Sequence, residues 1–194
     1  MIFFDWSLRI LSMMLLAGLV AYWIVSEFKS HQEKPKTESP NILSILQRIV
    51  AAVLYLFLFW QLMGHDFFGF KNMISNKLLG FVLIIFAVGV SVAARRELAA
   101  NWTDAAEYQI KKDQKLVTTG IYSYIRHPIY LGVTCTFLGV QLLVGSYLLL
   151  FFMIVIPLFS YFQAKREEKM LVNYFGKEYE EYKMKTQLFL PYLL

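Results

Sequence analysis

The chain has 194 residues, of which 58% are hydrophobic and only 17% are charged, and its mean hydropathy is +0.50. A soluble domain of this length has too small an interior to hide so much apolar surface from water, so the composition excludes an ordinary soluble globule and predicts a membrane protein. The single cysteine, Cys135, excludes an intrachain disulfide, and the three scattered histidines offer no Cys/His spacing for a metal site. The net charge of +5 would suit nucleic acid or a membrane surface, so the positions of the basic residues must decide between them.

The N-terminal half contains three apolar runs, at residues 8–27, 42–63 and 78–94. Each run is long enough to cross a hydrocarbon core of ~30 Å as a helix. The first run is not expected to be a signal peptide, because Asp5 interrupts a basic leader and no small-residue cleavage site follows. Residues 1–94 are therefore predicted to form a membrane base of three helices.

The second half contains an apolar run at 130–163 that is too long for one crossing. Gly145 and Ser146 lie at its middle, where a tight turn between antiparallel helices forms most easily. We expect a hairpin of two spans, 130–144 and 147–163. The predicted fold class is thus all-α, a polytopic membrane protein with five transmembrane helices.

The distribution of basic residues predicts the orientation of these spans. Most of the 19 Lys and Arg residues fall in the loops after the first and third spans and in the segment after the fifth. By the positive-inside rule, the N-terminus is expected outside and the C-terminus in the cytoplasm. Membrane topology thus accounts for the basic charge, and no nucleic-acid partner is expected. The basic residues placed inside are Lys29, Lys34, Lys36, Arg95, Arg96, Lys111, Lys112, Lys115, Arg126, Lys165, Arg166, Lys169, Lys177, Lys183 and Lys185.

Polar residues of the second half are concentrated in two segments, 95–129 and 164–194. The predicted hairpin brings both segments to the same face of the membrane. Residues 95–194 are therefore expected to form the functional part, in which the 95–129 loop and the C-terminal tail build a site at the cytoplasmic face.

The most informative stretch is LVTTGIYSYIRHPIYLG, residues 116–132. Pro128 suits the first turn of a helix, with His127 at the N-cap position. The first backbone N–H groups of such a helix lack intrahelical partners and attract an anion. The groups expected to lack partners are those of Ile129, Tyr130 and Leu131.

The side chains around this helix start also favour ligand binding. Arg126 and His127 add positive or donor groups, and Tyr122 and Tyr130 offer flat faces for an aromatic ring or a cation. A ligand that combines a carboxylate, a base and a positive centre would fit. The alternative is that Arg126 binds lipid phosphates while His127 only caps the helix.

The sequence SYFQAKREEKMLVNYFGKEYEEY follows the last apolar run and contains a second polar group. Gln163 and Glu167 are four residues apart, share one helix face, and could face the site. For Glu168, Lys169 and the charges at 178–183, a solvated helix face is the expectation.

Together, GIYSYIRHPIYLG and REEKMLVNYFGKEYEEYK resemble the C-terminal signature of the isoprenylcysteine carboxyl methyltransferases, which are membrane enzymes that use S-adenosylmethionine. The resemblance covers about residues 95–185. It depends on LVxxGxY, RHPxY and E-x7-FG-x2-Y-x2-Y occurring in this order, with a span between the last two. Related patterns occur in phospholipid N-methyltransferases and sterol reductases, which remain alternatives, and a non-catalytic membrane protein is a third.

The resemblance implies methyl transfer from S-adenosylmethionine to the carboxylate of a prenylated cysteine, or of a similar lipid-modified substrate in the bilayer. S-adenosylhomocysteine would be the product. The substrate would be either a protein or a small molecule. No G-x-G occurs among the ten glycines, so the cofactor is not expected in a Rossmann fold, and no metal is expected.

The resemblance also implies roles for individual residues. Glu167 matches an acidic catalytic residue, and Gln163 stands where animal members carry a substrate-binding arginine. The residues that match cofactor-binding segments are Gln114, Lys115, Leu116, Val117, Tyr122, His127, Pro128, Ile129 and Tyr130.

Overall fold

The protein is described here as a computed structural model that places residues 2–31, 42–65, 69–70, 73–98 and 115–190. Within these ranges the backbone is helical apart from connecting segments and two isolated β-bridges, Gly69–Ser146 and Ile125–Gln187. The elements are α1 (Ile2–His31), α2 (Ile42–Leu62), α3 (Ile74–Leu98), the short 3-10 helix η2 (Gly120–Ser123), α4 (Pro128–Val144), α5 (Leu148–Phe175) and α6 (Lys177–Lys185). The predicted all-α class is confirmed for the described residues.

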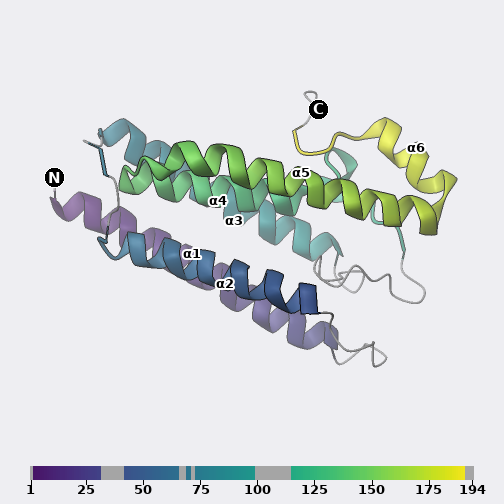
Figure 1. The fold of residues 1–194 in the computed structure, drawn as a ribbon, viewed down its shortest axis with the longest axis horizontal. Helices are drawn as coiled ribbons and strands as arrows, with labels where there is room; N and C mark the ends of the chain where they lie inside the picture. The colour runs from purple at the N-terminus through teal and green to yellow at the C-terminus, as the bar shows by residue number, and fades with distance from the viewer. Residues whose placement is uncertain (1, 32–41, 66–68, 71–72, 99–114, 191–194) are drawn as a thin grey trace.

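The helical hairpin forms where the sequence predicts it, between α4 and α5. Gly145 ends α4 in the left-handed conformation, with φ of 74°, and its N–H donates to the carbonyl of Gln141 at 2.9 Å. Glycine enters this region without steric cost, so the chain reverses within a few residues. As a result, α5 returns alongside α4 (Figure 1).

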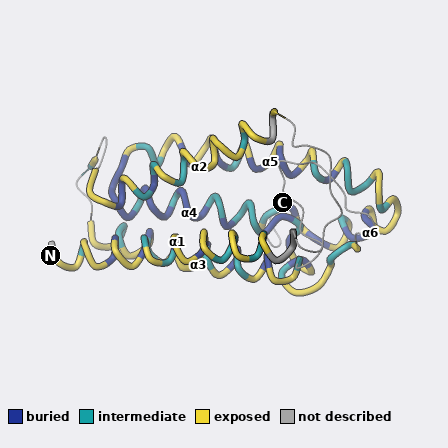
Figure 2. Tube along the Cα trace, turned by 90° about the horizontal axis from the view of Figure 1, so that it is seen from below, coloured by how far each residue is buried: buried dark blue, intermediate teal, exposed yellow. Residues whose placement is uncertain are grey.

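The five long helices are arranged with α4 at the centre (Figure 2). Helix α4 contacts α1, α2, α3 and α5, and it has no charged residue. One buried side chain from each helix illustrates the shared apolar core: Leu16, Leu58, Ile84, Val140 and Ile156. The central position of α4 explains why, among the described residues, those that follow the RHPxY motif are so largely buried.

The outer faces of the surrounding helices are apolar as well. Val53, Leu56 and Ile154 are examples, with 58%, 68% and 68% of their surfaces exposed. Four helices are long and apolar enough to cross a membrane, judged over the described residues: α1, α2, α3 and α5. Helix α4 is apolar but shorter, with 17 residues. The protein is therefore an integral, multi-pass membrane protein, in which four of the five predicted spans meet this length.

Helices α3 and α4 approach one another closely through small residues. A Cβ added at Gly80 would lie 2.5 Å from the carbonyl oxygen of Gly139 and 2.6 Å from the nitrogen of Leu143. At Gly132, an added Cβ would collide with the side chain of Ser91. The two backbones pack at this distance only because these positions carry no side chain.

The two ends of the bundle differ in content. The end that carries α6, here called the α6 end, also carries η2 and the C-terminal segment, as Figure 1 shows. The opposite end, here called the N-terminal end, has a buried polar cluster. Lys77 and Arg9 both pair with Asp5, and Arg9 donates to the backbone oxygen of Gln61 at 3.0 Å. The side chains of Gln61 and Gln141 exchange hydrogen bonds of 3.2 and 2.7 Å.

Candidate active site

The start of α4 has the predicted cap. His127 is the N-cap residue, and Pro128 occupies the first helical position, where no N–H is required. The N–H of Leu131 donates to the carbonyl of His127 at 3.4 Å, so the expectation that it lacks a partner is wrong. The carbonyl of an N-cap residue accepts the first intrahelical bond, which leaves the helix start with one backbone donor fewer than predicted.

The C-terminal segment pairs with the residues just before α4. The backbone N–H groups of Arg126 and His127 donate to the carbonyls of Gln187 and Leu188 at 2.8 and 3.1 Å. Ile125 and Gln187 form a parallel bridge. The loop before α4 and the tail after α6 therefore meet, as the sequence predicts.

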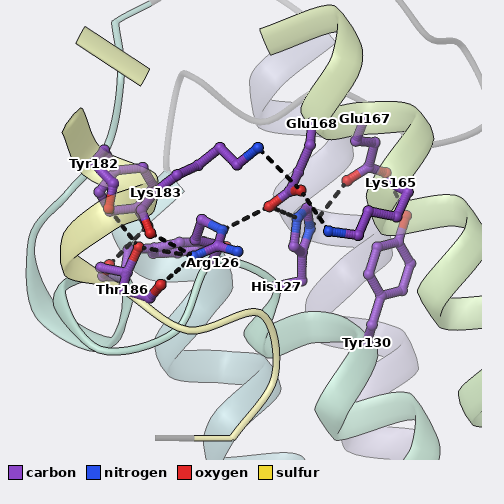
Figure 3. A network of polar contacts seen from close by, with 10 residues as sticks. Arg126, His127, Tyr130, Lys165, Glu167, Glu168, Tyr182, Lys183 and Thr186 are labelled. Atoms are coloured by element: carbon purple, nitrogen blue, oxygen red, sulfur yellow. Dashed lines mark hydrogen bonds and ion pairs between the residues drawn. The ribbon is translucent and has the colours of Figure 1, made fainter. Parts of the chain in front are cut away.

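The side chain of Arg126 forms its hydrogen bonds with other groups of the protein (Figure 3). Its Nε donates to Glu168 at 2.6 Å, and its Nη1 donates to the backbone oxygens of Lys183, at 3.2 Å, and Thr186. The side chains of Arg126 and Glu168 are 9% and 3% exposed. Arg126 thus directs its donors to Glu168 and the tail, not to lipid phosphates.

The expectation of a solvated Glu168 is wrong. Besides Arg126, its carboxylate faces Lys165 at 3.3 Å and Lys183 at 3.8 Å. Sequence position alone places Glu168 on the polar face of α5, but the segment before α4 and helix α6 bring two further basic partners to it, Arg126 and Lys183. Lys169 is exposed, as predicted.

Glu167 meets the RHPxY motif directly. One carboxylate oxygen accepts a hydrogen bond from the hydroxyl of Tyr130, and the other lies 3.4 Å from Nδ1 of His127. The rings of His127 and Tyr130 stack with their centroids 5.7 Å apart, and Phe189 lies edge-on to His127 at 6.3 Å. The Glu167 side chain remains 20% exposed, so one face of this carboxylate is accessible.

His127 lies between two carboxylates. Burial disfavours its charged form, but Glu167 and Glu168 outweigh this effect and raise the pKa of the imidazole above its usual value. Its Nε2 lies 3.9 Å from Glu168, beyond hydrogen-bond distance, and has no hydrogen-bond partner among the described residues. The site thus contains a buried nitrogen that can bond to a further polar group.

Two further predicted residues, Tyr122 and Gln163, are buried. The carbonyl of Tyr122 accepts a hydrogen bond of 2.7 Å from the hydroxyl of Tyr182. Burial raises the pKa of the Tyr122 phenol, and the nearby carboxylate of Glu167 raises it further. Gln163 is 8% exposed and lies one helical turn before Glu167.

The predicted cofactor segment at 114–117 is described only in part. Gln114 lies outside the described residues. Lys115 is exposed, and Leu116 and Val117 are half-buried in extended backbone leading to η2. Their role in binding the cofactor stays a prediction.

Sequence reasoning missed two members of the site, Glu168 and Tyr182. A signal for Glu168 was present, because a second carboxylate directly follows Glu167 and the RHPxY motif supplies both an arginine and a histidine. The spacing of Tyr179 and Tyr182 predicts only a pair that packs a short helix, whereas the hydrogen bond from Tyr182 to the carbonyl of Tyr122 depends on how α6 folds back.

The site combines groups suited to a ligand that carries both signs of charge. A partly exposed carboxylate, Glu167, can bind a cation, while buried His127 can donate to an acceptor. The stacked Tyr130 ring adds an aromatic face beside both.

A family model described as phospholipid methyltransferase matches residues 75–178, which is more than half of the chain. Three curated relatives are each named protein-S-isoprenylcysteine O-methyltransferase. The chain is 43% identical over 82 residues to the Schizosaccharomyces pombe protein, covering 41% of this chain and 34% of that one. The Saccharomyces cerevisiae protein is 33% identical over 128 residues, covering 64% and 54%, and the Homo sapiens protein is 26% identical over 124 residues, covering 63% and 44%. The matches thus span about half or less of these relatives.

A solved structure shares the fold. It is that of the eukaryotic intramembrane Ras methyltransferase, isoprenylcysteine carboxyl methyltransferase, with a TM-score of 0.59 and 23% identity over 76% of this chain and 53% of that one. The matched region 75–178 includes Arg126, His127, Glu167 and Glu168, which contact one another in the site. The chain belongs to the phospholipid methyltransferase family, and its similarity to the isoprenylcysteine carboxyl methyltransferases, expected from its motifs, is confirmed.

Proposed function

We propose that this protein is an S-adenosylmethionine-dependent methyltransferase that methylates the carboxylate of a prenylated cysteine, or of a similar lipid-modified substrate, within the membrane. The observation that carries the proposal is the contact of Glu167 with His127 and Tyr130, which joins the two motifs at one place. The names of the curated relatives support the same reaction class.

The donors and acceptors of the site fit this cofactor. The sulfonium and ammonium groups of the cofactor are cations, which the carboxylate of Glu167 can bind. The carboxylate of the cofactor can accept hydrogen bonds from the backbone N–H groups at the start of α4 and from Nε2 of His127. When bound, S-adenosylmethionine supplies a methyl group on a positively charged sulfur, and S-adenosylhomocysteine is left as product. The residues proposed to hold it are Gln114, Lys115, Leu116, Val117, Tyr122, His127, Pro128, Ile129 and Tyr130.

The reaction places modest demands on acid–base chemistry. A substrate carboxylate has a reference pKa near 3.5 and is ionised at neutral pH, so no strong general base is required. We assign Glu167 an orienting and electrostatic role, with its carboxylate held by Tyr130 and His127. In well-oriented systems, alignment of the reacting groups lowers the activation barrier by roughly 7–11 kcal/mol. The C-terminal segment that lies over the start of α4 helps exclude water from the reaction.

The substrate explains the membrane setting. Each CH₂ of a prenyl chain loses on the order of 0.8 kcal/mol on leaving lipid for water, so the chain stays in the bilayer during turnover. We assign Gln163 to the substrate, because it is buried on α5 one turn from Glu167. The prenyl chain then reaches the site laterally between helices.

The proposed topology follows the basic residues. Five helices cross the membrane, with α4 as the fourth, the N-terminus outside, and the α6 end in the cytoplasm. Residues 1–94 act as the membrane base and 95–194 as the catalytic part. At 1.5 Å per residue, α4 is about 25 Å long, which the central helix of a bundle tolerates because its neighbours shield its ends.

A second acceptor is favoured by one observation, the family description itself, which points to phospholipid amines. The two reactions differ in the methyl acceptor and share the cofactor. An assay that offers both acceptors separates them.

Binding of S-adenosylhomocysteine to the full chain in detergent, measured by calorimetry, tests the proposal. We expect saturable binding that weakens about tenfold or more in His127→Ala and Glu167→Gln, because each loses a charge-assisted contact. Glu180→Gln, an exposed carboxylate on α6, is the matched control and should bind as the unaltered chain does. Methyl transfer from S-adenosylmethionine to N-acetyl-farnesylcysteine and to phosphatidylethanolamine then identifies the acceptor. Absence of binding by the unaltered chain would exclude the proposed function.

A further inference from the structure

The C-terminal segment after α6, residues 186–190, is joined to the loop before α4 by its backbone. The N–H of Gln187 donates to the carbonyl of Tyr124 at 3.0 Å, and the carbonyl of Leu188 accepts from the N–H of His127 at 3.1 Å. Hydrogen bonds that run in both directions fix how two segments are aligned. Each side chain of the C-terminal segment therefore has a defined neighbour.

The side chains of this segment also hold it in place. Thr186 and Leu188 are buried, whereas Gln187 between them is exposed. The hydroxyl of Thr186 donates to the carbonyl of Tyr182 at 2.7 Å, and the carbonyl of Thr186 accepts from the guanidinium of Arg126. Alternating buried and exposed side chains are typical of an extended segment with one covered face. The segment is thus an integral part of the packed protein.

Phe189 brings an aromatic ring to His127. This ring is half-buried and lies edge-on to the imidazole, with the centroids 6.3 Å apart and an angle of 61° between the planes. Tyr130 stacks on the same imidazole, with a centroid distance of 5.7 Å and an angle of 28°. Edge-to-face and offset-stacked arrangements are both favourable for aromatic rings, so the two neighbours together define the plane of the imidazole.

The orientation of this imidazole matters because its two nitrogens differ. Nδ1 lies 3.4 Å from Glu167, whereas Nε2 is buried and has no hydrogen-bond partner within the part of the chain that the structure describes. The χ2 torsion of a histidine is broad, so packing against neighbouring side chains must hold the ring in one orientation. A buried polar atom without a partner needs an explanation, and a bound ligand provides one.

We propose that Phe189 is a positioning residue, which holds the imidazole of His127 so that Nε2 can donate to the carboxylate of S-adenosylmethionine. The inference rests on the proposed function and deepens it, because it adds residues 186–190 to the cofactor site, beyond the family match at 75–178. Phenylalanine suits the role, because its ring packs against the imidazole but carries no polar atom that would compete for Nε2.

Calorimetry with S-adenosylhomocysteine on full chains in detergent tests the inference, using Phe189→Ala, Phe189→Tyr and the control Leu190→Ala. We expect Phe189→Ala to raise the Kd about three- to tenfold, which is the range for loss of one aromatic pair. Phe189→Tyr keeps the ring and should bind within about twofold of the unaltered chain. Leu190 is the next residue of the same segment and is exposed, so its substitution should leave the Kd unchanged.

Steady-state kinetics provide a readout that a merely structural role would not produce. Phe189→Ala should raise the KM for S-adenosylmethionine by the same factor as the Kd. We expect kcat and the KM for the lipid substrate to change less than about twofold, because the groups that bind the methyl acceptor are untouched. An equal loss in all three quantities would indicate general damage to the structure and would overturn the inference.

A double variant determines whether Phe189 acts through His127. In a chain that already carries His127→Ala, the further change Phe189→Ala should alter the Kd less than about twofold, since no imidazole is left to hold. Fully additive losses would overturn the inference, because Phe189 would then contribute to binding independently. Should Phe189→Ala fail to fold, Phe189→Leu keeps most of the apolar volume without the ring and replaces it in each comparison.

Two further results separate this inference from the proposed function. An unaltered chain that binds no S-adenosylhomocysteine overturns both. Normal binding by the unaltered chain, with the same Kd in Phe189→Ala, overturns the positioning role alone and leaves the proposed function standing.

Discussion

His127 shows how a single side chain can link two motifs. It stands at the N-cap position of α4, its ring stacks on Tyr130, and its two ring nitrogens face the carboxylates of Glu167 and Glu168. These carboxylates raise its pKa despite its burial, so its charged form is stabilised in the folded protein. Protonation of His127 is therefore coupled to folding.

This coupling predicts a pH dependence of stability. Because the folded pKa is higher than the unfolded value of about 6.5, the stabilisation is fully present below about pH 6.5 and is lost as the pH rises through the folded pKa. Unfolding of the purified chain in mixed detergents should show this decline, and His127→Gln should abolish it. The exposed His65→Gln is the control and should retain it; the same decline in both variants would contradict the assignment.

Glu168 and Arg126 form a buried pair that the tail completes. Each is almost inaccessible to solvent, and Arg126 also binds the backbone of Lys183 and Thr186. Removal of one partner leaves the other charge buried without compensation, which is more costly than loss of the pair as a whole.

Glu168→Gln is accordingly expected to lower the free energy of unfolding by about 3 kcal/mol. Glu181→Gln, at an exposed position of α6, should change it by less than about 0.5 kcal/mol. Detergent unfolding followed by circular dichroism measures both. Equal stability of the two variants would show that Arg126 does not depend on Glu168.

At the scale of elements, the packing of α3 against α4 determines the relative positions of the residues in the candidate active site. Gly80 and Gly139 let the two backbones meet near the N-terminal end, and Gly132 meets Ser91 closer to the site. His127 directly precedes α4, and the hydroxyl of Thr119, the residue before η2, donates to Glu97 of α3 at 2.9 Å. A shift between α3 and α4 would therefore move both parts of the proposed cofactor site.

Gly80→Ala is expected to destabilise the protein by about 1–3 kcal/mol, because its Cβ would meet backbone atoms that cannot move aside separately. Gly89 lies on the same helix with nothing within 4 Å of an added Cβ. Gly89→Ala should therefore stabilise by about 0.5–1 kcal/mol through helix propensity. Thermal unfolding in one detergent compares the two, and changes of the same sign would argue against close packing at Gly80.

At the scale of the whole molecule, two polar ends are separated by an apolar core. The α6 end contains the candidate active site, whereas the N-terminal end contains the cluster around Asp5, Arg9 and the Gln61–Gln141 pair. The second cluster joins α1, α2, α3 and α4 far from the site, so it contributes to stability without touching the cofactor region.

The glutamine pair tests this separation. Gln61→Leu alone should lower stability by about 1–2 kcal/mol, because it leaves the buried amide of Gln141 without its partner. The double variant with Gln141→Leu should regain most of the loss, since both amides are then replaced by apolar groups. Affinity for S-adenosylhomocysteine, measured alongside, should stay constant in both variants; a parallel loss of affinity would mean that the two ends are coupled.

The sequence alone determined the membrane setting, the helical hairpin and the family. These features depend on local properties: apolar runs long enough to span a bilayer, Gly145 at the turn, Pro128 at a helix start, and motifs in a fixed order. Such properties can be read from neighbouring residues because they arise from backbone sterics and hydropathy along a single segment.

Only the tertiary structure decided which charges are internal. Glu168 and Lys169 are adjacent and equally polar, yet one is buried against Arg126 and the other is exposed. That difference arises because α6 folds back and residues 187–188 pair with 126–127, contacts between segments about 60 positions apart that no local pattern encodes. The place of α4 at the centre of the bundle was decided in the same way.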